Sequence, residues 1–404
     1  MYSFLEISTI YPSFIPYFER KYPECKDLNY KQHYDLLCSE YFGFADNYIF
    51  YLNKLGISAN NIIVNYEELQ SKWAKEHNIS ANGKSLILKQ IEYYEPNVVF
   101  MHGLDLVDYS TLNKIKDYIG SIKLLTAFHA APISELEIQF GREFDIVFTC
   151  NRGMYLDFKI KGLCSEFLSH AFEKRVLEQL SNKNKENKLV FAGSLTSGGQ
   201  FHDDRIEMLN KMQKEGFNLD IYANIRDKNS FSNKMLLTGF RVYSLFPKIF
   251  KKIIHRNKSL SRLETLDFNF FQESEEIKYL KNYSRSPKFG LDYYQVLNSA
   301  SVVFNNHINI SGKYAGNIRM FEVTGVGSLL LTDKKIDNND LFEPGKEILV
   351  YDDYNDAIEK VKWALNNPEE AAEIAKAGQE RTLNQHTYEN RADELNEIIL
   401  KYLN

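Results

Sequence analysis

Residues 301–333, SVVFNNHINISGKYAGNIRMFEVTGVGSLLLTD, decide the fold of the second half of the chain. A short apolar run at 301–306 leads through a polar loop into a helical pattern at 317–326, and a second apolar run follows at 328–333. Strand, helix and strand in this order indicate a parallel pair, because parallel strands need a long crossover connection. We therefore expect a parallel sheet with helices on its faces.

The same alternation of apolar runs and amphipathic stretches continues on both sides of this unit. The runs NVVFM at 97–101 and DIVFT at 145–149 are nearly continuous in apolar residues, as is typical of strands covered on both faces. We expect further strands at 3–8, 61–65, 97–102, 122–128, 145–150, 188–195, 219–225 and 347–352, and helices at 30–55, 83–94, 111–119, 152–161, 203–215 and 292–298.

A polar stretch without apolar periodicity, LSNKNKEN at 180–187, separates two such alternations and indicates an interdomain linker. A chain of 404 residues is also long for one core, since domains usually hold about 100–200 residues. We predict an α/β protein with two tandem parallel-sheet domains, at 1–180 and 188–385. The tail from 354 reads as three helices, with breaks at 367–368 and 385–386, and the segment 386–404 can cross back to the first domain.

Composition and charge exclude several classes of protein. A net charge of -5 and a pI of about 6.1 leave no electrostatic footprint for nucleic acid. Four widely spaced cysteines without CxxC spacing favour reduced thiols in the cytoplasm over a disulfide framework or a zinc site. The N-terminal residues do not resemble a signal peptide, and no run approaches 18 uncharged apolar residues, so we expect no transmembrane helix.

One segment of the second half is both basic and apolar. In LFPKIFKKIIHRNK, at 245–258, phenylalanine and isoleucine interleave with lysine and arginine. We favour a helix that packs through its apolar stripe and keeps its lysines in water. The alternative is peripheral contact with anionic lipid at the inner face of the cell membrane.

Loops at the carboxyl ends of strands hold the candidate ligand-binding residues, because ligands of open α/β sheets bind there. The first loop is a turn at Gly193 and Ser194, followed by a helix that starts near His202 and Arg205. Glycine lets backbone N–H groups approach an anion closely, and a helix N-terminus favours negative charge. These residues could reach a diphosphate.

A second polar loop, NNHINISGKYAGN at 305–317, leads into the helix that starts at Asn317. The loop could wrap phosphates and sugar hydroxyls, and the alternative is a surface turn. On the helix, Arg319 offers its guanidinium fork to a diphosphate. Glu322 lies one turn further in an otherwise apolar helix, where a carboxylate is costly unless it is paired. A ribose diol would pair with it, and so would Arg319 three residues back.

Four stretches, from about residue 290 to 391, closely resemble the C-terminal half of CgeB-like glycosyltransferases, of the spore maturation protein CgeB type within the GT-B superfamily. The earlier pieces NVVFMHG, DIVFT and LVFAGSL resemble the same family's first half more weakly. The four stretches are DYYQVLNSASVVFNNH at 292–307, NIRMFEVTGVGSLLLTD at 317–333, LFEPGKEILVYDD at 341–353 and IAKAGQERTLNQHTYENR at 374–391.

The resemblance implies a GT-B fold, in which two Rossmann-like domains face each other across a cleft, with the donor on the second domain. It places the family's ribose-binding Glu at Glu322 and its phosphate-facing loop at Asn317 and Arg319. Many retaining GT-B enzymes have a second Glu eight residues earlier, where this chain has Tyr314, so retention is favoured over inversion but stays open. The donor-binding candidates are Gly193, Ser194, His202, Arg205, Asn306, His307, Lys313, Tyr314, Gly316, Asn317, Arg319, Met320 and Glu322.

We therefore expect a glycosyltransferase that moves a sugar from a nucleotide-diphosphate donor to a hydroxyl of a glycan, lipid-linked or protein acceptor in bacterial surface polysaccharide assembly. No DxD motif follows a buried strand, so we expect no metal and no other cofactor, and protein cations would stabilise the leaving diphosphate. At strand ends of the first domain, His129 and His102 are candidate catalytic bases or hydroxyl anchors, and Asp105 is the candidate carboxylate.

Two other functions fit the same patterns. One is a non-catalytic GT-B-like protein that binds a nucleotide sugar as a scaffold. The other is a nucleotide-sugar epimerase or hydrolase on the same fold. Donor turnover separates all three.

Overall fold

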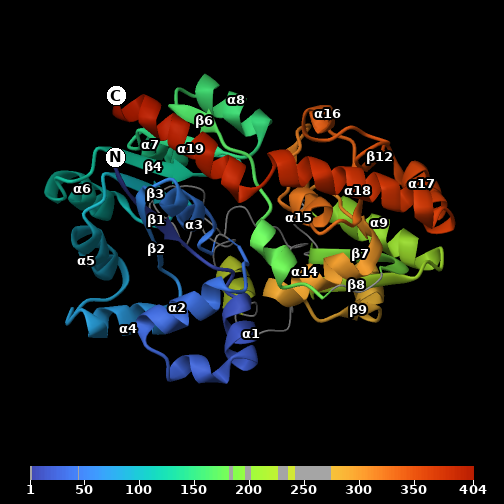
Figure 1. Cartoon of the computed structure of the whole chain (residues 1–404), viewed down its shortest axis with the longest axis horizontal. Coiled ribbons are helices and arrows are strands. Elements are labelled where there is room, and N and C mark those ends of the chain that lie inside the picture. The colour runs from blue at the N-terminus through green and yellow to red at the C-terminus, as the bar shows by residue number, and fades with distance from the viewer. Residues whose placement is uncertain (1, 44, 182–184, 196–201, 226–234, 242–273) are drawn as a thin grey trace.

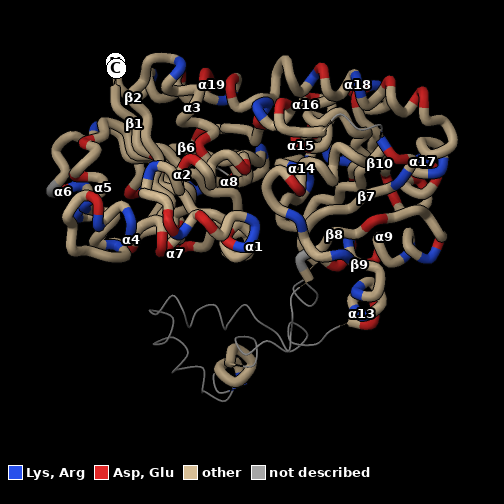
Figure 2. The backbone as a smooth tube through the Cα atoms, turned by 60° about the horizontal axis from the view of Figure 1, so that its bottom comes forward, with Lys and Arg blue, Asp and Glu red and all other residues tan. Residues whose placement is uncertain are grey.

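A computed structural model of the chain describes residues 2–43, 45–181, 185–195, 202–225, 235–241 and 274–404 (Figure 1). Two parallel sheets of six strands each lie side by side, and helices flank both. Basic and acidic residues are spread over the surface elements of both halves (Figure 2). The basic segment predicted at 245–258 lies outside the described residues.

The first sheet has the strand order β2-β1-β3-β4-β5-β6. Its strands β3, β4 and β5 are apolar at almost every position because both faces are buried. One face packs with Phe4 and Phe100 in its core, and the other with Leu5 and Val99. The strands are β1 (Ser3–Ser8), β2 (Ser58–Ile63), β3 (Val98–Met101), β4 (Leu124–Phe128), β5 (Ile146–Thr149) and β6 (Ser165–Phe167).

The helices of the first half connect and cover these strands. The helix predicted over 30–55 is wrong in its middle, where Tyr41 and Gly43 have φ values of 51° and 71° and cannot continue a right-handed helix. Two shorter helices replace it, and α1, α4, α7 and β6 lie outside the predicted ranges. The helices are α1 (Phe14–Lys21), α2 (Tyr30–Cys38), α3 (Asn47–Lys54), α4 (Glu67–Glu76), α5 (Gly83–Tyr94), α6 (Tyr109–Tyr118), α7 (Glu135–Gly141) and α8 (Arg152–Ile160).

The second sheet has the strand order β12-β11-β10-β7-β8-β9. The chain therefore starts in the middle of the sheet, builds outward through β8 and β9, and returns to build the other side from β10. Two residues of the predicted linker, Glu186 and Asn187, belong to β7. The strands are β7 (Glu186–Leu195), β8 (Leu219–Ile225), β9 (Ser284–Arg285), β10 (Ala300–Phe304), β11 (Leu329–Asp333) and β12 (Leu349–Tyr351).

Helices cover the second sheet in the same way, and the tail breaks close to the two predicted positions. No helix among the described residues has the length and apolar character needed to cross a membrane. The helices are α9 (Asp203–Lys214), α13 (Glu275–Lys281), α14 (Gly290–Ser299), α15 (Arg319–Gly325), α16 (Asn338–Leu341), α17 (Tyr354–Asn366), α18 (Pro368–Gln385) and α19 (Tyr388–Leu403).

The last helix, α19, lies against the first sheet, beside α3 (Figure 1). Its residues Leu395 and Ile399 are fully buried in the same core as Phe4. Just before α19, the backbone of Thr387 pairs with that of Phe172, which precedes the second sheet. The chain thus passes between its two halves twice, and the two passages are bonded to each other.

A buried carboxylate ties the first half to the start of α14. Glu40 is fully buried and its Oε2 accepts a hydrogen bond from the backbone N–H of Leu291 at 3.0 Å. Gly290 has a φ of 58°, and a Cβ at this position would collide with the Glu40 carboxylate. Lys21 pairs with Glu40 at 2.9 Å and with Asp292 at 3.3 Å. This network fixes α14 to the first half, and α14 carries a side chain of the site described below.

We predict that Gly325→Ala destabilises the fold. A Cβ at residue 325 would collide with the ring of Phe172, which is fully buried. Overpacking of this kind costs about 1–3 kcal/mol. Equilibrium denaturation in urea should show a loss of this size in the free energy of unfolding.

The matched control is Gly120→Ala, because nothing lies within 4 Å of the Cβ position there. Its free energy of unfolding should change by less than about 0.5 kcal/mol. Equal losses in the two variants would contradict the packing described for Phe172.

Candidate functional site

The candidate site lies where the second sheet changes direction. β7 and β10 are neighbours, but the chain leaves β7 toward α9 and β8, and leaves β10 toward α15 and β11. The two connections diverge at the carboxyl ends of these strands. A crevice at such a switch point is where open α/β sheets bind ligands.

Arg205, in the first turn of α9, spans this switch point. Its Nη1 donates to the carbonyl oxygen of Ser194 at 3.3 Å, and its Nε donates to that of Asn306 at 3.2 Å. Ser194 lies at the end of β7 and Asn306 lies just after β10, so the guanidinium bridges the two diverging chains. Arg205 is buried, with 5% of its surface exposed. Burial and the nearby Arg319 lower the pKa of Arg205 to about 9, which leaves it charged at neutral pH.

Arg319, the first residue of α15, brings a second cation to the same place. A Cβ at Gly193 would lie 2.9 Å from Nη1 of Arg319 and 3.2 Å from its Nη2, so only glycine lets the guanidinium approach the end of β7. Burial disfavours the charged form, but Tyr293 and Glu322 outweigh this effect and raise the pKa of Arg319. Among the described residues, no carboxylate pairs with Arg205 or Arg319 in a salt bridge.

A buried guanidinium group, Arg205, and a half-buried one, Arg319, repel each other and lack a paired carboxylate, so they form a site for an anion. The site has two positive charges and several N–H donors at one strand end. A diphosphate ligand matches this set better than a ligand with a single carboxylate. The N-terminus of α9 reaches pocket B through His202, and Asp203 and Asp204 in its first turn offset the partial positive charge of its backbone N–H groups.

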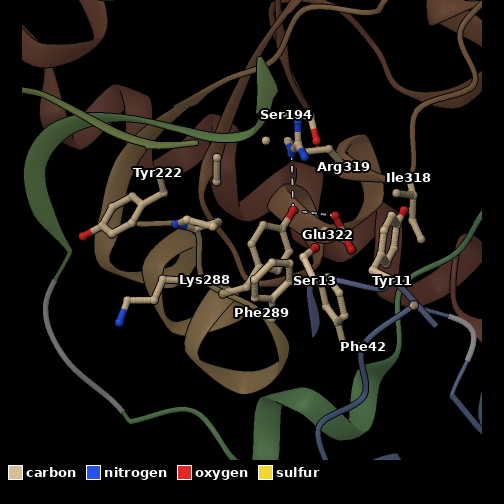
Figure 3. Close-up of a pocket in the computed structure, with 15 residues that line it drawn as sticks. Tyr11, Ser13, Phe42, Ser194, Tyr222, Lys288, Phe289, Ile318, Arg319 and Glu322 are labelled. Atoms are coloured by element: carbon tan, nitrogen blue, oxygen red, sulfur yellow. Dashed lines mark hydrogen bonds between the residues drawn. The ribbon is translucent and has the colours of Figure 1, made fainter. Parts of the chain in front are cut away.

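Glu322 and Arg319 do not pair directly; the hydroxyl of Tyr293 on α14 lies between them. This hydroxyl donates to Oε2 of Glu322 at 2.6 Å and accepts from Nε of Arg319 at 3.3 Å, as the dashed lines in Figure 3 show. Burial raises the pKa of Glu322, while Arg319 and Tyr293 oppose that rise. The carboxylate faces a pocket, where a donor such as a sugar hydroxyl would bind it.

Two adjoining pockets, A and B, surround this cluster, and both are lined by residues from the two halves of the chain. Tyr11, Ser194, Ile318 and Arg319 belong to both. Pocket A further includes Phe42, Gly193, Tyr222, Lys288, Phe289, Tyr293 and Glu322 (Figure 3). Pocket B, of about 420 Å³, further includes Cys150, Asn151, His170, His202, Arg205, Gly316 and Asn317.

The structure brings together seven of the predicted donor-binding residues in addition to Glu322. Gly193 and Arg319 line pocket A, and Ser194, His202, Arg205, Gly316, Asn317 and Arg319 line pocket B. Nδ1 of His202 lies 2.9 Å from the carbonyl oxygen of Ser194, which also accepts from Arg205.

Five other donor-binding candidates do not line either pocket. Lys313 is exposed, and Met320 is fully buried in the core behind α15. Tyr314 packs against Gly153 of the first half. Asn306 donates to the hydroxyl of Tyr351 at 2.9 Å, and His307 pairs with Asp333 through Nδ1 at 2.7 Å. Asn306 therefore reaches the site only through its backbone carbonyl on Arg205.

The three catalytic candidates of the first half lie outside both pockets as well. His129 follows β4, and burial lowers the pKa of its imidazole, so it is neutral at pH 7. Asp105 is exposed and close enough to His129 to oppose that shift. His102 is buried, and its Nε2 lies 2.5 Å from Oε1 of Glu6, so it faces the core of the first sheet.

Two residues of the site carry no signal in the sequence. Tyr293 and His170 come from segments far from the polar loops, and only the fold brings them to the cleft. His170 lines pocket B, and burial lowers its pKa to about 4. Asn151 differs from these two, because it directly follows the strand predicted at 145–150, at a strand end where ligand-binding residues are expected. It lines pocket B, and its Nδ2 donates to the carbonyl oxygen of Ser311 at 3.1 Å. Among the described residues, no group of three or more potential ligands is arranged to hold a metal ion.

A family model described as "Glycosyl transferase-like" matches residues 256–397, about a third of the chain. The match includes α14, β10, α15 and the tail, and thus Tyr293, Arg319 and Glu322. A search of curated proteins gives no match.

Solved structures share the whole architecture at low sequence identity. A glycosyltransferase from Rickettsia africae is 11% identical with a TM-score of 0.56, covering 100% of this chain and 98% of the other. Alr3699/HepE from Anabaena, in complex with UDP-glucose, is 11% identical with a TM-score of 0.54, covering 99% and 100%. Sucrose-phosphate synthase from Thermosynechococcus elongatus is also 11% identical with a TM-score of 0.54, covering 99% of both chains.

These structures confirm the predicted GT-B fold, with two Rossmann-like sheets that face a cleft. The family match and the fold together support a glycosyltransferase.

We predict that inorganic pyrophosphate binds at the two arginines. Arg205→Gln and Arg319→Gln should each weaken binding by about 10–100-fold, since a hydrogen bond to a charged group contributes about 1.5–3 kcal/mol. Isothermal titration at low salt measures the dissociation constants.

Lys313→Gln is the control, because Lys313 is exposed and lies outside both pockets. It should leave the affinity for pyrophosphate within about twofold. Affinity that depends on Lys313 and not on the arginines would place the anion elsewhere.

Proposed function

We propose that this protein is a glycosyltransferase whose nucleoside diphosphate sugar binds along pockets A and B. One observation carries the proposal: the buried carboxylate of Glu322 and the unpaired cations Arg205 and Arg319 face one cleft at the switch point of the second sheet. A ribose diol next to a diphosphate matches this order of charges. The family match to the same helices supports it.

The arrangement of the pockets gives the donor a direction. Glu322 belongs to pocket A, Arg205 to pocket B, and Arg319 to both. The ribose therefore lies in pocket A with the base toward Tyr222 and Phe289, and the diphosphate crosses at Arg319. The sugar lies in pocket B, beside Asn151 and His170 of the first half. The UDP-glucose in the Alr3699/HepE structure supports a donor of this kind.

In the reaction, the bond between the anomeric carbon and the β-phosphate oxygen breaks, and the anomeric carbon bonds to an acceptor hydroxyl oxygen, whose proton leaves to a base or to the leaving group. Charge develops on the departing diphosphate, and Arg205 and Arg319 are in position to stabilise it. We propose that these cations act without a metal ion.

The finer assignments are proposals as well. We favour transfer with retention, in the cytoplasm, to a bacterial surface glycan, by an enzyme of the CgeB-like type. His129, which is neutral at pH 7, is the preferred base of the first half, with Asp105 beside it. Because both lie outside pockets A and B, this role requires the two halves to close on the acceptor.

The test separates ribose from diphosphate. Glu322→Ala should weaken UDP binding by about 1–3 kcal/mol, the cost of unpaired hydroxyls, and leave pyrophosphate binding unchanged. Arg205→Gln should weaken both. Calorimetric titration of each variant with UDP and with pyrophosphate measures these effects.

Equal weakening of both ligands by Glu322→Ala would contradict the ribose role. Donor hydrolysis with a panel of UDP-, GDP- and dTDP-sugars then tests catalysis. Binding without any turnover would favour the non-catalytic scaffold, and an isomerised donor would favour the epimerase.

A further inference from the structure

A second hollow, which we call the edge pocket, lies on the first domain away from the cleft. It has a volume of about 540 Å³, within the range of roughly 300–1,000 Å³ that small-molecule sites occupy. The connection between α2 and α3 separates it from pocket A, because Phe42 and Gly43 line pocket A and Asp46 lines the edge pocket. Its walls are α2, α3 and the end of α5, and its floor is β2, the edge strand of the sheet.

One wall of the edge pocket is aromatic. Tyr30 and Tyr34 lie one turn apart on α2, with ring centroids 6.1 Å apart and planes at 31°. Tyr94, from the end of α5, and Phe50, from α3, extend this surface. Aromatic faces of this kind bury apolar C–H groups. The hydroxyls of Tyr30 and Tyr34 already bond to Tyr94 and Cys38, so this wall offers mainly ring surface. The C–H face of a pyranose ring has the matching character.

The floor of the pocket offers one uncommitted amide. Asn60 is half-buried on β2, and its side chain makes no hydrogen bond with any described residue. The neighbouring amides are occupied: Asn61 bonds Ser8 and the carbonyl oxygen of Ala45. An amide provides two donors and one acceptor, the pattern that a pair of sugar hydroxyls needs.

The edge strand is closed to another strand at this point. Asn53 donates to the carbonyl oxygen of Ala59 at 3.0 Å and accepts from its N–H at 3.2 Å. Its amide thus takes the place of a neighbouring strand, so the addition of an extended peptide to β2 is blocked here.

The charged residues of the pocket are balanced and already engaged. Two lysines and two aspartates line it. Lys31 pairs with Asp35 at 2.5 Å, and Asp46 receives two hydrogen bonds from Arg175, at 2.9 and 3.2 Å. Nζ of Lys54 lies 4.6 Å from the centroid of the Phe50 ring. The unpaired cations of the cleft have no counterpart here, so the pocket does not suit a phosphate or a uronate.

We infer that the edge pocket binds an uncharged sugar unit of a glycan. This inference rests on the proposed function, because a glycan bound there is the distal part of an acceptor whose reacting end extends past pocket A to the donor sugar in pocket B. The α2–α3 connection contributes residues to both pockets, Phe42 and Gly43 to pocket A and Asp46 to the edge pocket. The enzyme would thus hold its acceptor at two places.

The test uses Asn60→Trp, which fills the pocket without removing a hydrogen bond. Ser58→Trp is the matched control, because Ser58 lies two residues earlier on the same face of β2, is exposed and does not line the pocket. The probes are uncharged trisaccharides of glucose, mannose, galactose and N-acetylglucosamine. Saturation-transfer NMR on the full chain measures their binding, and calorimetric titration with UDP runs in parallel.

At least one trisaccharide should bind wild type and Ser58→Trp within twofold of each other and bind Asn60→Trp at least tenfold more weakly. All three proteins should bind UDP equally, which also shows that Asn60→Trp is folded. The inference is overturned if no trisaccharide binds, if Asn60→Trp binds as well as Ser58→Trp, or if a uronate trisaccharide binds more tightly than its neutral counterpart. If the trisaccharides fail these tests but wild type binds UDP, the inference is wrong and the proposed function stands. If wild type binds a trisaccharide but does not bind UDP, the proposed function is contradicted and sugar binding in the edge pocket is not.

Discussion

The cluster of Arg205, Arg319 and Glu322 depends on one constraint: two guanidinium groups, one buried and one half-buried, lie at the ends of β7 and β10 without a carboxylate partner. Such a placement is unfavourable in isolation, and the fold stabilises it with backbone carbonyls and with the hydroxyl of Tyr293. The remaining compensation would come from a bound anion. Gly193 is needed because it leaves room for the Arg319 guanidinium. The proposed direction of the donor, with its ribose at Glu322, follows from the same placement of the two arginines.

The same cluster is linked to the first half of the chain through α14. Glu40 bonds the backbone of Leu291 in the first turn of α14, and two residues later Tyr293 contacts both Arg319 and Glu322. The position of the first half is therefore connected to the ribose-facing carboxylate through a single helix. Tyr11 and Phe42 complete pocket A from the same side. Pocket A therefore has all of its walls only while the first half of the chain is packed against the second.

The sequence predicts the sheets well because buried parallel strands are continuous apolar runs, and it predicts Glu322 because a carboxylate in an apolar helix needs a partner. Short elements such as β6 and β9 escape prediction, since two or three residues carry no periodicity. Tyr293 escapes for another reason, because its role depends on the packing of α14 on α15. Lys313 shows the opposite error: a polar loop predicts donors but not the direction in which each side chain points.

The most direct measurement is a crystal structure of the protein with UDP. Our account predicts the ribose hydroxyls on the Glu322 carboxylate, the diphosphate between Arg205 and Arg319, and the β-phosphate toward pocket B. UDP bound elsewhere, or with its ribose away from Glu322, would contradict the assignment of this cleft as the donor site.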